Sequence, residues 1–123
     1  IPNNPAWHDD LAMKNLMCYL SPDMEKCTGV DLIPTYSYLR VYKKGDELKR
    51  HIDRNSCEFS VTLTLRREPN ERVWPIYLET DSVHKVELEE GDGLIYKGIE
   101  SPHWRDKFEG SRLAQVFLHY VRR

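Results

Sequence analysis

The sequence predicts a mainly β domain, an antiparallel sandwich or barrel backed by short helices at its N-terminal end. Three observations lead to this expectation. Apolar and polar residues alternate with a period of two over much of residues 34–121, which is typical of half-buried strands. Turn signals separate these stretches, and apolar residues recur at helical spacing only before residue 30. We therefore expect a single domain over residues 1–123, with an N-terminal helical part at 1–30 and a β-barrel core at 34–121.

Two helices are expected first. Residues 9–20 carry a broad apolar face, and Asp9 or Asp10 can cap the start of this helix. A second short helix is predicted to begin at Pro22, because proline suits the first helical position, and to end at Gly29.

The first three strands follow the helices. Residues 36–42 alternate as a strand does, and residues 59–65 are rich in β-branched side chains. Residues 74–79 contain Pro75, which belongs in the first turn of a strand or at an edge of the sheet.

Three further strands complete the predicted core. Residues 83–88 alternate again, residues 94–96 are short and apolar, and residues 112–121 form a long, apolar closing strand. Turns are expected at Gly45-Asp46, at residues 67–72 around Pro69-Asn70, and at Glu90-Gly91-Asp92-Gly93.

The composition limits the partners and the cellular compartment that we expect for the protein. The chain has 40% hydrophobic and 31% charged residues and a net charge of −2, so neither nucleic acid nor a membrane is expected as a partner. No apolar run is long enough to span a membrane, and no signal peptide is visible. The three cysteines, Cys18, Cys27 and Cys57, are an odd number without CxxC spacing. They favour a reducing, cytoplasmic compartment over a disulfide framework.

The pair His51-x-Asp53 is the first candidate for chemistry. The pair lies between two expected strands, and residues i and i+2 of an extended segment point to the same side. Both side chains can therefore reach one ion. With a second histidine they would form the 2-His-1-carboxylate triad that suits Fe(II) and oxygen. The alternative is that both are ordinary turn residues.

Three histidines compete for the remaining ligand position. His103 follows a turn and a strand that would bring the chain back across the sandwich, and we favour it. His84 lies beside Asp81-Ser82 at the start of a strand without a cationic partner for a co-substrate, and His119 has the opposite strand parity to Arg112. Both are better explained as surface or satisfied core residues.

Arg112 and Tyr42 are candidates for binding a carboxylate co-substrate. Arg112 heads an apolar strand, and a buried arginine needs an anionic partner that it can bind with two hydrogen bonds. The alternative is an Arg112 side chain in solvent. Tyr42 is a candidate second donor to the same carboxylate, or else an ordinary half-buried strand residue.

At these residues the chain resembles the Fe(II)/2-oxoglutarate-dependent oxygenases, specifically their prolyl-hydroxylase-like branch. One matching stretch is Leu39-Arg40-Val41-Tyr42-Lys43-Lys44-Gly45, then Leu48 and His51-Ile52-Asp53. The second is Glu90-Gly91-Asp92-Gly93-Leu94-Ile95-Tyr96, then His103 and Gly110-Ser111-Arg112. The resemblance covers residues 36–121.

The resemblance implies a fold and a set of roles. The family fold is a double-stranded β-helix, a jelly-roll or cupin-like barrel with short N-terminal helices packed on one sheet. His51, Asp53 and His103 would bind the iron, and Arg112 would hold the distal carboxylate of 2-oxoglutarate. Tyr42 would hydrogen-bond to that carboxylate. Thr64 lies near the position where some members place another tyrosine donor.

The family reaction would use Fe(II), 2-oxoglutarate and O₂, with ascorbate as a further reductant. It would hydroxylate an unactivated C–H bond and release succinate and CO₂. The expected substrate is a peptidyl residue such as proline, or a small molecule. Two other functions stay open. One is a non-enzymatic, cupin-like β-sandwich that binds a ligand. The other is a metal-dependent dioxygenase that uses the same triad without the keto acid.

Overall fold

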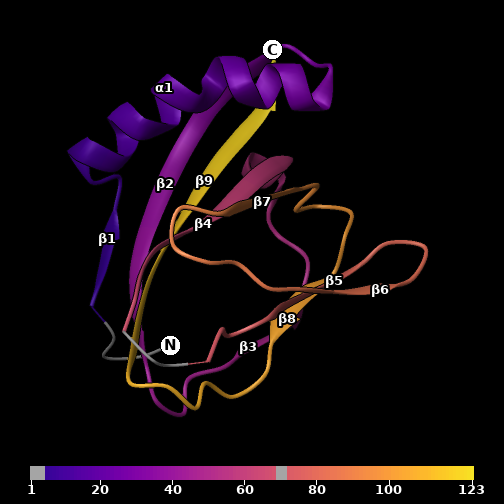
Figure 1. Cartoon of the computed structure of the whole chain (residues 1–123). Helices are drawn as coiled ribbons and strands as arrows, with labels where there is room; N and C mark the ends of the chain where they lie inside the picture. Colours follow the sequence, from indigo (N-terminus) through magenta and orange to yellow (C-terminus); the bar gives the residue numbers. More distant parts are fainter. Residues whose placement is uncertain (1–4, 69–71) are drawn as a thin grey trace.

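Two antiparallel sheets face each other, and one helix crosses the end of the larger sheet (Figure 1). This computed structural model describes residues 5–68 and 72–123. The larger sheet has the strand order β1-β2-β9-β4-β7 and the smaller one β3-β8-β5-β6. The arrangement is the expected double-stranded β-helix.

The elements have the following bounds. The strands are β1 (Ala6–His8), β2 (Leu32–Lys43), β3 (Leu48–His51), β4 (Phe59–Arg67), β5 (Ile76–Glu79), β6 (Val83–Val86), β7 (Gly93–Tyr96), β8 (His103–Arg105) and β9 (Arg112–Arg122). The helices are α1 (Leu11–Thr28) and the 3-10 turn η1 (Asn55–Cys57).

Helix α1 is continuous, so the expectation of two helices was wrong. Pro22 lies inside it, and the Ser21 hydroxyl donates to the carbonyl of Met17 (3.1 Å). Met17 and Met24 are two turns apart, face the same side and are both buried. Burying each methionine contributes about 1.5–3 kcal/mol, which offsets the roughly 3 kcal/mol that an internal proline costs.

The ends of α1 follow the sequence signals. The side chain of Asp10 accepts a hydrogen bond from the backbone N–H of Met13 (3.3 Å). Gly29 ends the helix with φ = 72°, a left-handed conformation that glycine adopts without a steric penalty. No helix in the described part of the chain is both long and apolar enough to cross a membrane.

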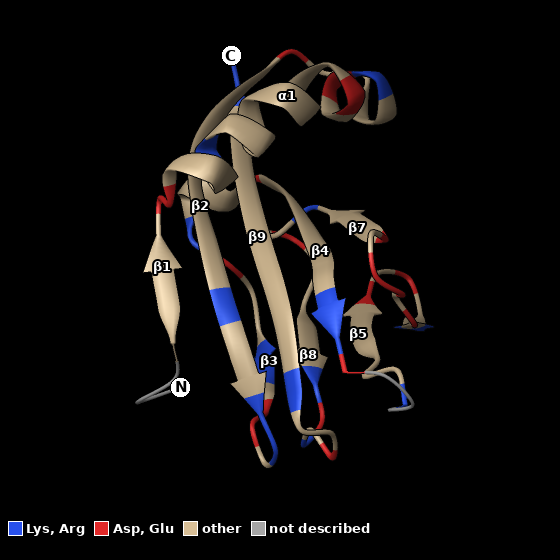
Figure 2. Cartoon of the chain, turned by 60° about the vertical axis from the view of Figure 1, so that its left-hand side comes forward, with Lys and Arg blue, Asp and Glu red and all other residues tan. Residues whose placement is uncertain are grey.

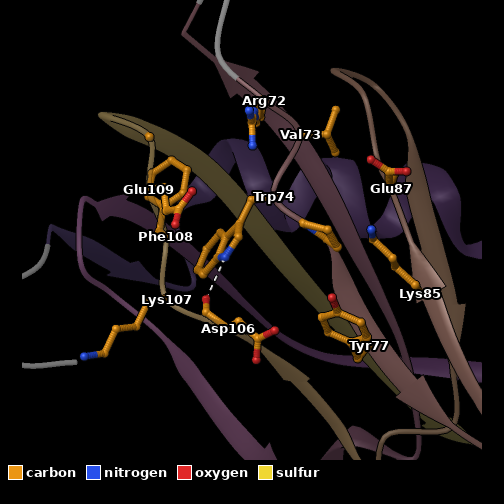
Figure 3. Close-up of a pocket in the computed structure, with 12 residues that line it drawn as sticks. Arg72, Val73, Trp74, Tyr77, Lys85, Glu87, Asp106, Lys107, Phe108 and Glu109 are labelled. Carbon is orange, nitrogen blue, oxygen red and sulfur yellow. Dashed lines mark hydrogen bonds between the residues drawn. The ribbon is translucent and has the colours of Figure 1, made fainter.

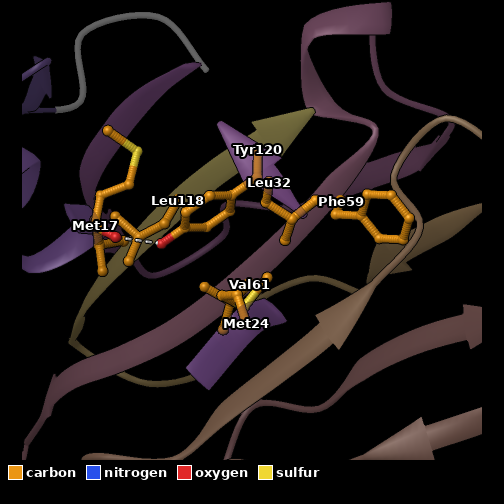
Figure 4. Close-up of a cluster of buried hydrophobic side chains, with 8 residues drawn as sticks. Met17, Met24, Leu32, Phe59, Val61, Leu118 and Tyr120 are labelled. Atoms are coloured by element: carbon orange, nitrogen blue, oxygen red, sulfur yellow. Dashed lines mark hydrogen bonds between the residues drawn. The ribbon is translucent and has the colours of Figure 1, made fainter. Parts of the chain in front are cut away.

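A hydrophobic core fills the space between α1 and the larger sheet (Figure 4). The Tyr120 hydroxyl donates to the Met17 carbonyl (2.7 Å), so even the polar tip of this aromatic residue is satisfied. The buried members are Met17, Met24, Leu32, Phe59, Val61, Val116, Leu118 and Tyr120.

The strands differ from the prediction mainly at their ends. Strand β2 begins at Leu32 instead of Tyr36, β5 begins one residue after Pro75, and β6 ends at Val86 instead of Leu88. Strands β1, β3 and β8 were not predicted, because their three or four residues are neither a run of apolar side chains nor part of a longer alternating stretch. The turn expected at residues 67–72 lies partly outside the described residues.

The register of β2 and β9 decides which side chains face the space between the sheets. Tyr38 pairs with Phe117 and Tyr42 with Leu113. These residues point between the sheets, whereas Val116 and Leu118, of the opposite parity, pack toward α1. Charged residues of both signs gather in the loops at the ends of the strands away from α1 (Figure 2).

Candidate metal centre

The pairing of β3 with β8 brings two distant histidines together. His51, the last residue of β3, is the direct partner of His103, the first residue of β8. Their imidazole centroids lie 4.4 Å apart. Paired residues of antiparallel strands point to the same face, so the register places both rings at one end of the space between the sheets.

Both imidazoles converge on the carboxylate of Asp53. The Nε2 atoms of His51 and His103 lie 3.2 Å and 3.1 Å from the same Asp53 oxygen, Oδ1. The other oxygen, Oδ2, is buried and has no hydrogen-bond partner in the structure. An unpaired buried carboxylate oxygen is costly, and a cation beside it would remove that cost.

The δ nitrogens fix the orientation of the two rings. Nδ1 of His51 lies 2.6 Å from the carbonyl oxygen of Lys49, and Nδ1 of His103 lies 2.8 Å from that of Ser101. A carbonyl only accepts, so both Nδ1 atoms carry the proton. A protonated ring donates from Nε2 to the Asp53 carboxylate, whereas a neutral ring turns the Nε2 lone pair toward the same point, where an ion can replace the proton. A metal ion fits this set of donors, because backbone-anchored histidines binding through Nε2 are a common arrangement in metal sites.

The charges of the site favour the same conclusion. Burial raises the pKa of Asp53, but hydrogen bonds from His103 and His51 outweigh it and hold this pKa well below its usual range. The hydrogen bond to Asp53 raises the pKa of His51 above its usual value. Asp53 is therefore ionised at neutral pH, as a metal ligand must be.

Gly98 makes room for Asp53. A Cβ added at Gly98 would lie 2.4 Å from Asp53 Oδ2 and 2.6 Å from the carbonyl oxygen of Cys57. The carbonyl of Gly98 also accepts a hydrogen bond from the Asp53 backbone N–H (2.8 Å). This close approach accounts for a glycine here without any positive φ.

A cavity of about 290 Å³ opens from the three ligands into the space between the sheets. Tyrosine and phenylalanine side chains form part of its wall. The lining residues are Tyr36, Tyr38, Arg40, Tyr42, Leu48, His51, Ile52, Asp53, Arg54, Cys57, Tyr96, His103, Phe117 and His119.

Of the expected co-substrate residues, only Tyr42 lies in this cavity. Tyr42 is fully buried and packs edge-on against Trp74. Thr64 is buried elsewhere, and its hydroxyl donates to Oε1 of Gln115 (2.9 Å). Arg112 is exposed, and its parity is opposite to that of Phe117, which lines the cavity. The structure thus does not bring Arg112 or Thr64 to the three ligands.

His119 and Cys57 line the cavity, although the sequence offered little reason to choose them. Asp53, Cys57 and His119 form a second group whose possible ligand atoms all lie within 4.8 Å of one another. Burial lowers the pKa of His119 to about 4, and its Nδ1 lies 2.7 Å from the Ser60 hydroxyl. The sequence placed His119 and Arg112 on opposite faces of the last strand, but it did not show which of the two faces points inward.

Arg105 is a third residue near the site, after His119 and Cys57, that the sequence offered little reason to choose. Only 2% of it is exposed, and its guanidinium lies 4.9 Å from the centroid of the Trp74 ring. Nη1 donates to the Trp74 carbonyl (2.8 Å). Burial lowers the pKa of Arg105 to about 10, so the side chain is still a cation at neutral pH. Its position two residues after His103 on one strand was the available clue.

A larger cavity of about 720 Å³ lies elsewhere, near Trp74 (Figure 3). Trp74 donates its indole N–H to the carbonyl of Asp106 there (2.7 Å). Neither potential metal-binding group found among the described residues lies in this cavity. We therefore place the candidate site at the smaller cavity, because ligand chemistry identifies a reactive centre better than size does.

Comparisons with known proteins give the fold a context. No protein-family model and no curated protein matches the sequence. A 2OG-Fe(II) oxygenase family oxidoreductase from Burkholderia pseudomallei superposes with a TM-score of 0.74 at 13% identity, over 89% of this chain and 57% of that one. The present chain thus spans little more than half of that enzyme.

Two further solved structures share the architecture. A prolyl-4-hydroxylase from Pseudomonas putida has a TM-score of 0.66 at 18% identity and covers 98% of this chain and 72% of its own. The non-heme α-ketoglutarate-dependent epimerase SnoN from nogalamycin biosynthesis has a TM-score of 0.73 at 15% identity, over 97% and 61% of the two chains. At such identities the likeness establishes the double-stranded β-helix fold.

Proposed function

We propose that this chain carries an Fe(II)- and 2-oxoglutarate-dependent dioxygenase site. One observation carries the proposal. Two histidines held through Nδ1 direct their Nε2 atoms at a single carboxylate oxygen of Asp53, at 3.1 and 3.2 Å, inside a double-stranded β-helix. Two imidazoles and one carboxylate bind one face of an octahedral Fe(II) and leave the opposite positions free. The names of the similar structures agree with this chemistry.

Each part of the site would have its own role. His51, Asp53 and His103 would hold the ion, and the carbonyls of Lys49 and Ser101 would keep the two imidazoles in the binding tautomer. Bound iron would supply the oxygen chemistry that no side chain can perform. The aromatic side chains in the cavity wall would exclude water, and the protein would position both reactants.

The overall reaction would consume 2-oxoglutarate, O₂ and a C–H bond, and would yield succinate, CO₂ and an alcohol. The first two electrons that reduce O₂ come from the decarboxylated keto acid and the other two from the C–H bond. Ascorbate as an added reductant stays a prediction.

We further propose a peptidyl residue such as proline as the substrate. The similar prolyl-4-hydroxylase from Pseudomonas putida supports this assignment. So does the shape of the site: the His51 side chain is 37% exposed, and the neighbouring Ile52 is apolar and 56% exposed. A large substrate could therefore bring one side chain to the ion from the His51 side, while His103 stays covered.

Anaerobic titration with Fe(II) and 2-oxoglutarate tests the site without knowledge of the substrate. We expect the visible charge-transfer band of a chelated keto acid, and its loss in His51→Ala. Iron binding without the band would favour a dioxygenase that does not use the keto acid. A folded protein that binds no iron would leave the non-enzymatic ligand-binding module as the better explanation.

Proline-containing peptides then test the substrate. Incubation with Fe(II), 2-oxoglutarate and O₂ should add one oxygen atom to the peptide and form an equal amount of succinate. Succinate formed equally with and without any of the peptides would reject a peptidyl substrate but would leave the oxygenase assignment intact.

A further inference from the structure

A buried arginine without a counter-charge stands behind the candidate metal centre. Arg105 is 2% exposed, and within the described part of the chain its hydrogen bond is that from Nη1 to the carbonyl of Trp74 (2.8 Å). Its Nε and Nη2 atoms are buried and have no hydrogen-bond partner among those residues. Among residues 5–68 and 72–123, no carboxylate forms an ion pair with it. A buried cation left in this state is unfavourable until an anion occupies the space beside it.

Arg105 faces the cavity side of its sheet. Residues i and i+2 of a strand share a face, so Arg105 points to the same side as His103. Leu48, its direct partner across β3 and β8, lines the cavity. The guanidinium interacts electrostatically with the phenols of Tyr42 and Tyr96, which also line it. Arg105 is not itself one of the residues that line the cavity, but it lies next to Tyr42 and Tyr96, which do, about 7 Å along the strand from His103.

From these contacts we infer that Arg105, and not Arg112, binds the distal carboxylate of 2-oxoglutarate. The inference rests on the proposed function. A five-carbon keto acid bound to the metal through oxygens of its C1 carboxylate and C2 keto group would extend along β8 toward Arg105. There the free Nε and Nη2 atoms of Arg105 offer two parallel donors, the geometry that matches a carboxylate. Tyr42 offers a further donor beside it.

The position of Arg112 argues against the same role. Arg112 is exposed, pairs with Lys43 at the end of the larger sheet and has the parity that points away from the cavity. To reach the metal ligands it would need a one-residue shift of β9, which would also turn Val116 and Leu118 out of the core under α1.

Arg40 and Arg54 are two further cations that line the cavity, and Arg54 donates from Nη2 to the Tyr36 hydroxyl (3.3 Å). Of these two, Arg40 is the cation that lies beside Tyr42. It is partly exposed and lies over the rings of Tyr38 and Tyr42, with 5.7 Å and 5.5 Å from its Cζ to the centroids. This placement suits a residue at the side of the cavity, so Arg40 serves as the second comparison in the test.

A matched pair of ligands tests the role of Arg105. Under nitrogen, the Fe(II)-loaded protein is titrated with 2-oxoglutarate and with 2-oxopentanoate, which has the same length but no distal carboxylate. We expect the wild type to prefer 2-oxoglutarate, and Arg105→Gln to lose about 30-fold or more of its affinity for 2-oxoglutarate alone. Arg112→Gln and Arg40→Gln should keep the preference. A purely structural effect of the substitution would weaken the binding of 2-oxoglutarate and of 2-oxopentanoate equally.

Each outcome decides one point. If the wild type gives no charge-transfer band with either keto acid, the proposed function itself fails. If the wild type prefers 2-oxoglutarate and Arg105→Gln keeps that preference, the inference about Arg105 is wrong, and a loss in Arg112→Gln or Arg40→Gln would assign the role to that residue instead. Should Arg105→Gln not fold, Arg105→Lys keeps the charge but not the paired donors. We expect an intermediate preference for it, and an unchanged preference would overturn the inference.

Discussion

Nε2 of His103 lies 3.1 Å from Oδ1 of Asp53, although the two residues are 50 positions apart in the chain. The pairing of β3 with β8 accounts for this contact, because it sets His51 opposite His103. Asp53 follows His51 by two residues, so its carboxylate lies beside both imidazoles. The geometry of the site therefore depends on a strand register and not on one flexible loop.

Replacing the central carboxylate should abolish metal binding. We expect Asp53→Asn to weaken binding of Fe(II) or Mn(II) by at least about 100-fold, more than the loss of an outer-shell partner usually costs, because the charged ligand is removed. Calorimetric titration under nitrogen measures this. Asp81→Asn is the matched control, because Asp81 is exposed and lies 4.0 Å from His84, which forms another His–Asp pair. Similar losses in both variants would argue against the site.

A methyl group at residue 98 should damage the same site without removing a ligand. In Gly98→Ala the added Cβ would meet Oδ2 of Asp53 and the Cys57 carbonyl at under 3 Å, so both must move. We expect about 1–3 kcal/mol lower stability and metal affinity lower by about 10-fold or more. In the control Gly93→Ala the nearest atom to the new Cβ is a Val61 methyl carbon at 3.0 Å, and its other neighbours lie at 3.4 Å or more. Unchanged metal binding in Gly98→Ala would contradict the role given to this glycine.

His119 should make the metal-free protein less stable in acid. Burial lowers its folded-state pKa to about 4, below its usual value near 6.5, so the folded state resists protonation of His119. The contribution of the neutral His119 ring to the free energy of unfolding is fully present above pH 6.5. It is lost as the pH falls toward 4. The loss amounts to up to about 3 kcal/mol.

Urea unfolding at pH 7 and pH 4.5, in the presence of a chelator, measures this effect. His119→Asn keeps a polar group near the Ser60 hydroxyl but does not titrate in this range. Its stability should fall less than that of the wild type between the two values. Parallel losses would mean that other groups cause the acid sensitivity.

The core under α1 should depend on its buried methionines. Met24 is 2% exposed, and we expect Met24→Ala to lower the free energy of unfolding by about 2–5 kcal/mol through the cavity it leaves. Leu11→Ala, at a residue that is 74% exposed on the same helix, should change it by less than about 0.5 kcal/mol. Equal effects at the two positions would show that α1 does not pack as described. Denaturant titration of both variants provides the comparison.

The sequence by itself determined the features that arise from neighbouring residues. The capping of α1 by Asp10 and Gly29 follows from side chains and conformations within a few positions. The period of two predicted most strands, and the extended His51-x-Asp53 segment placed both side chains on one side. Such patterns are local and can be seen without knowing the partners of a strand. Strand β8 (His103–Arg105) is neither an apolar run nor part of a longer alternating stretch, so it shows no such pattern.

Only the tertiary structure decided which face of each strand turns inward. Arg112 and His119 have opposite parities, and the pairing of β9 with β2 sends His119 into the cavity and Arg112 into solvent. Likewise, the pairing of β8 with β3 buries Arg105 beside the cavity. The physical reason is the side-chain period of two: a register different by one residue exchanges the two faces, and register depends on contacts between strands far apart in the chain.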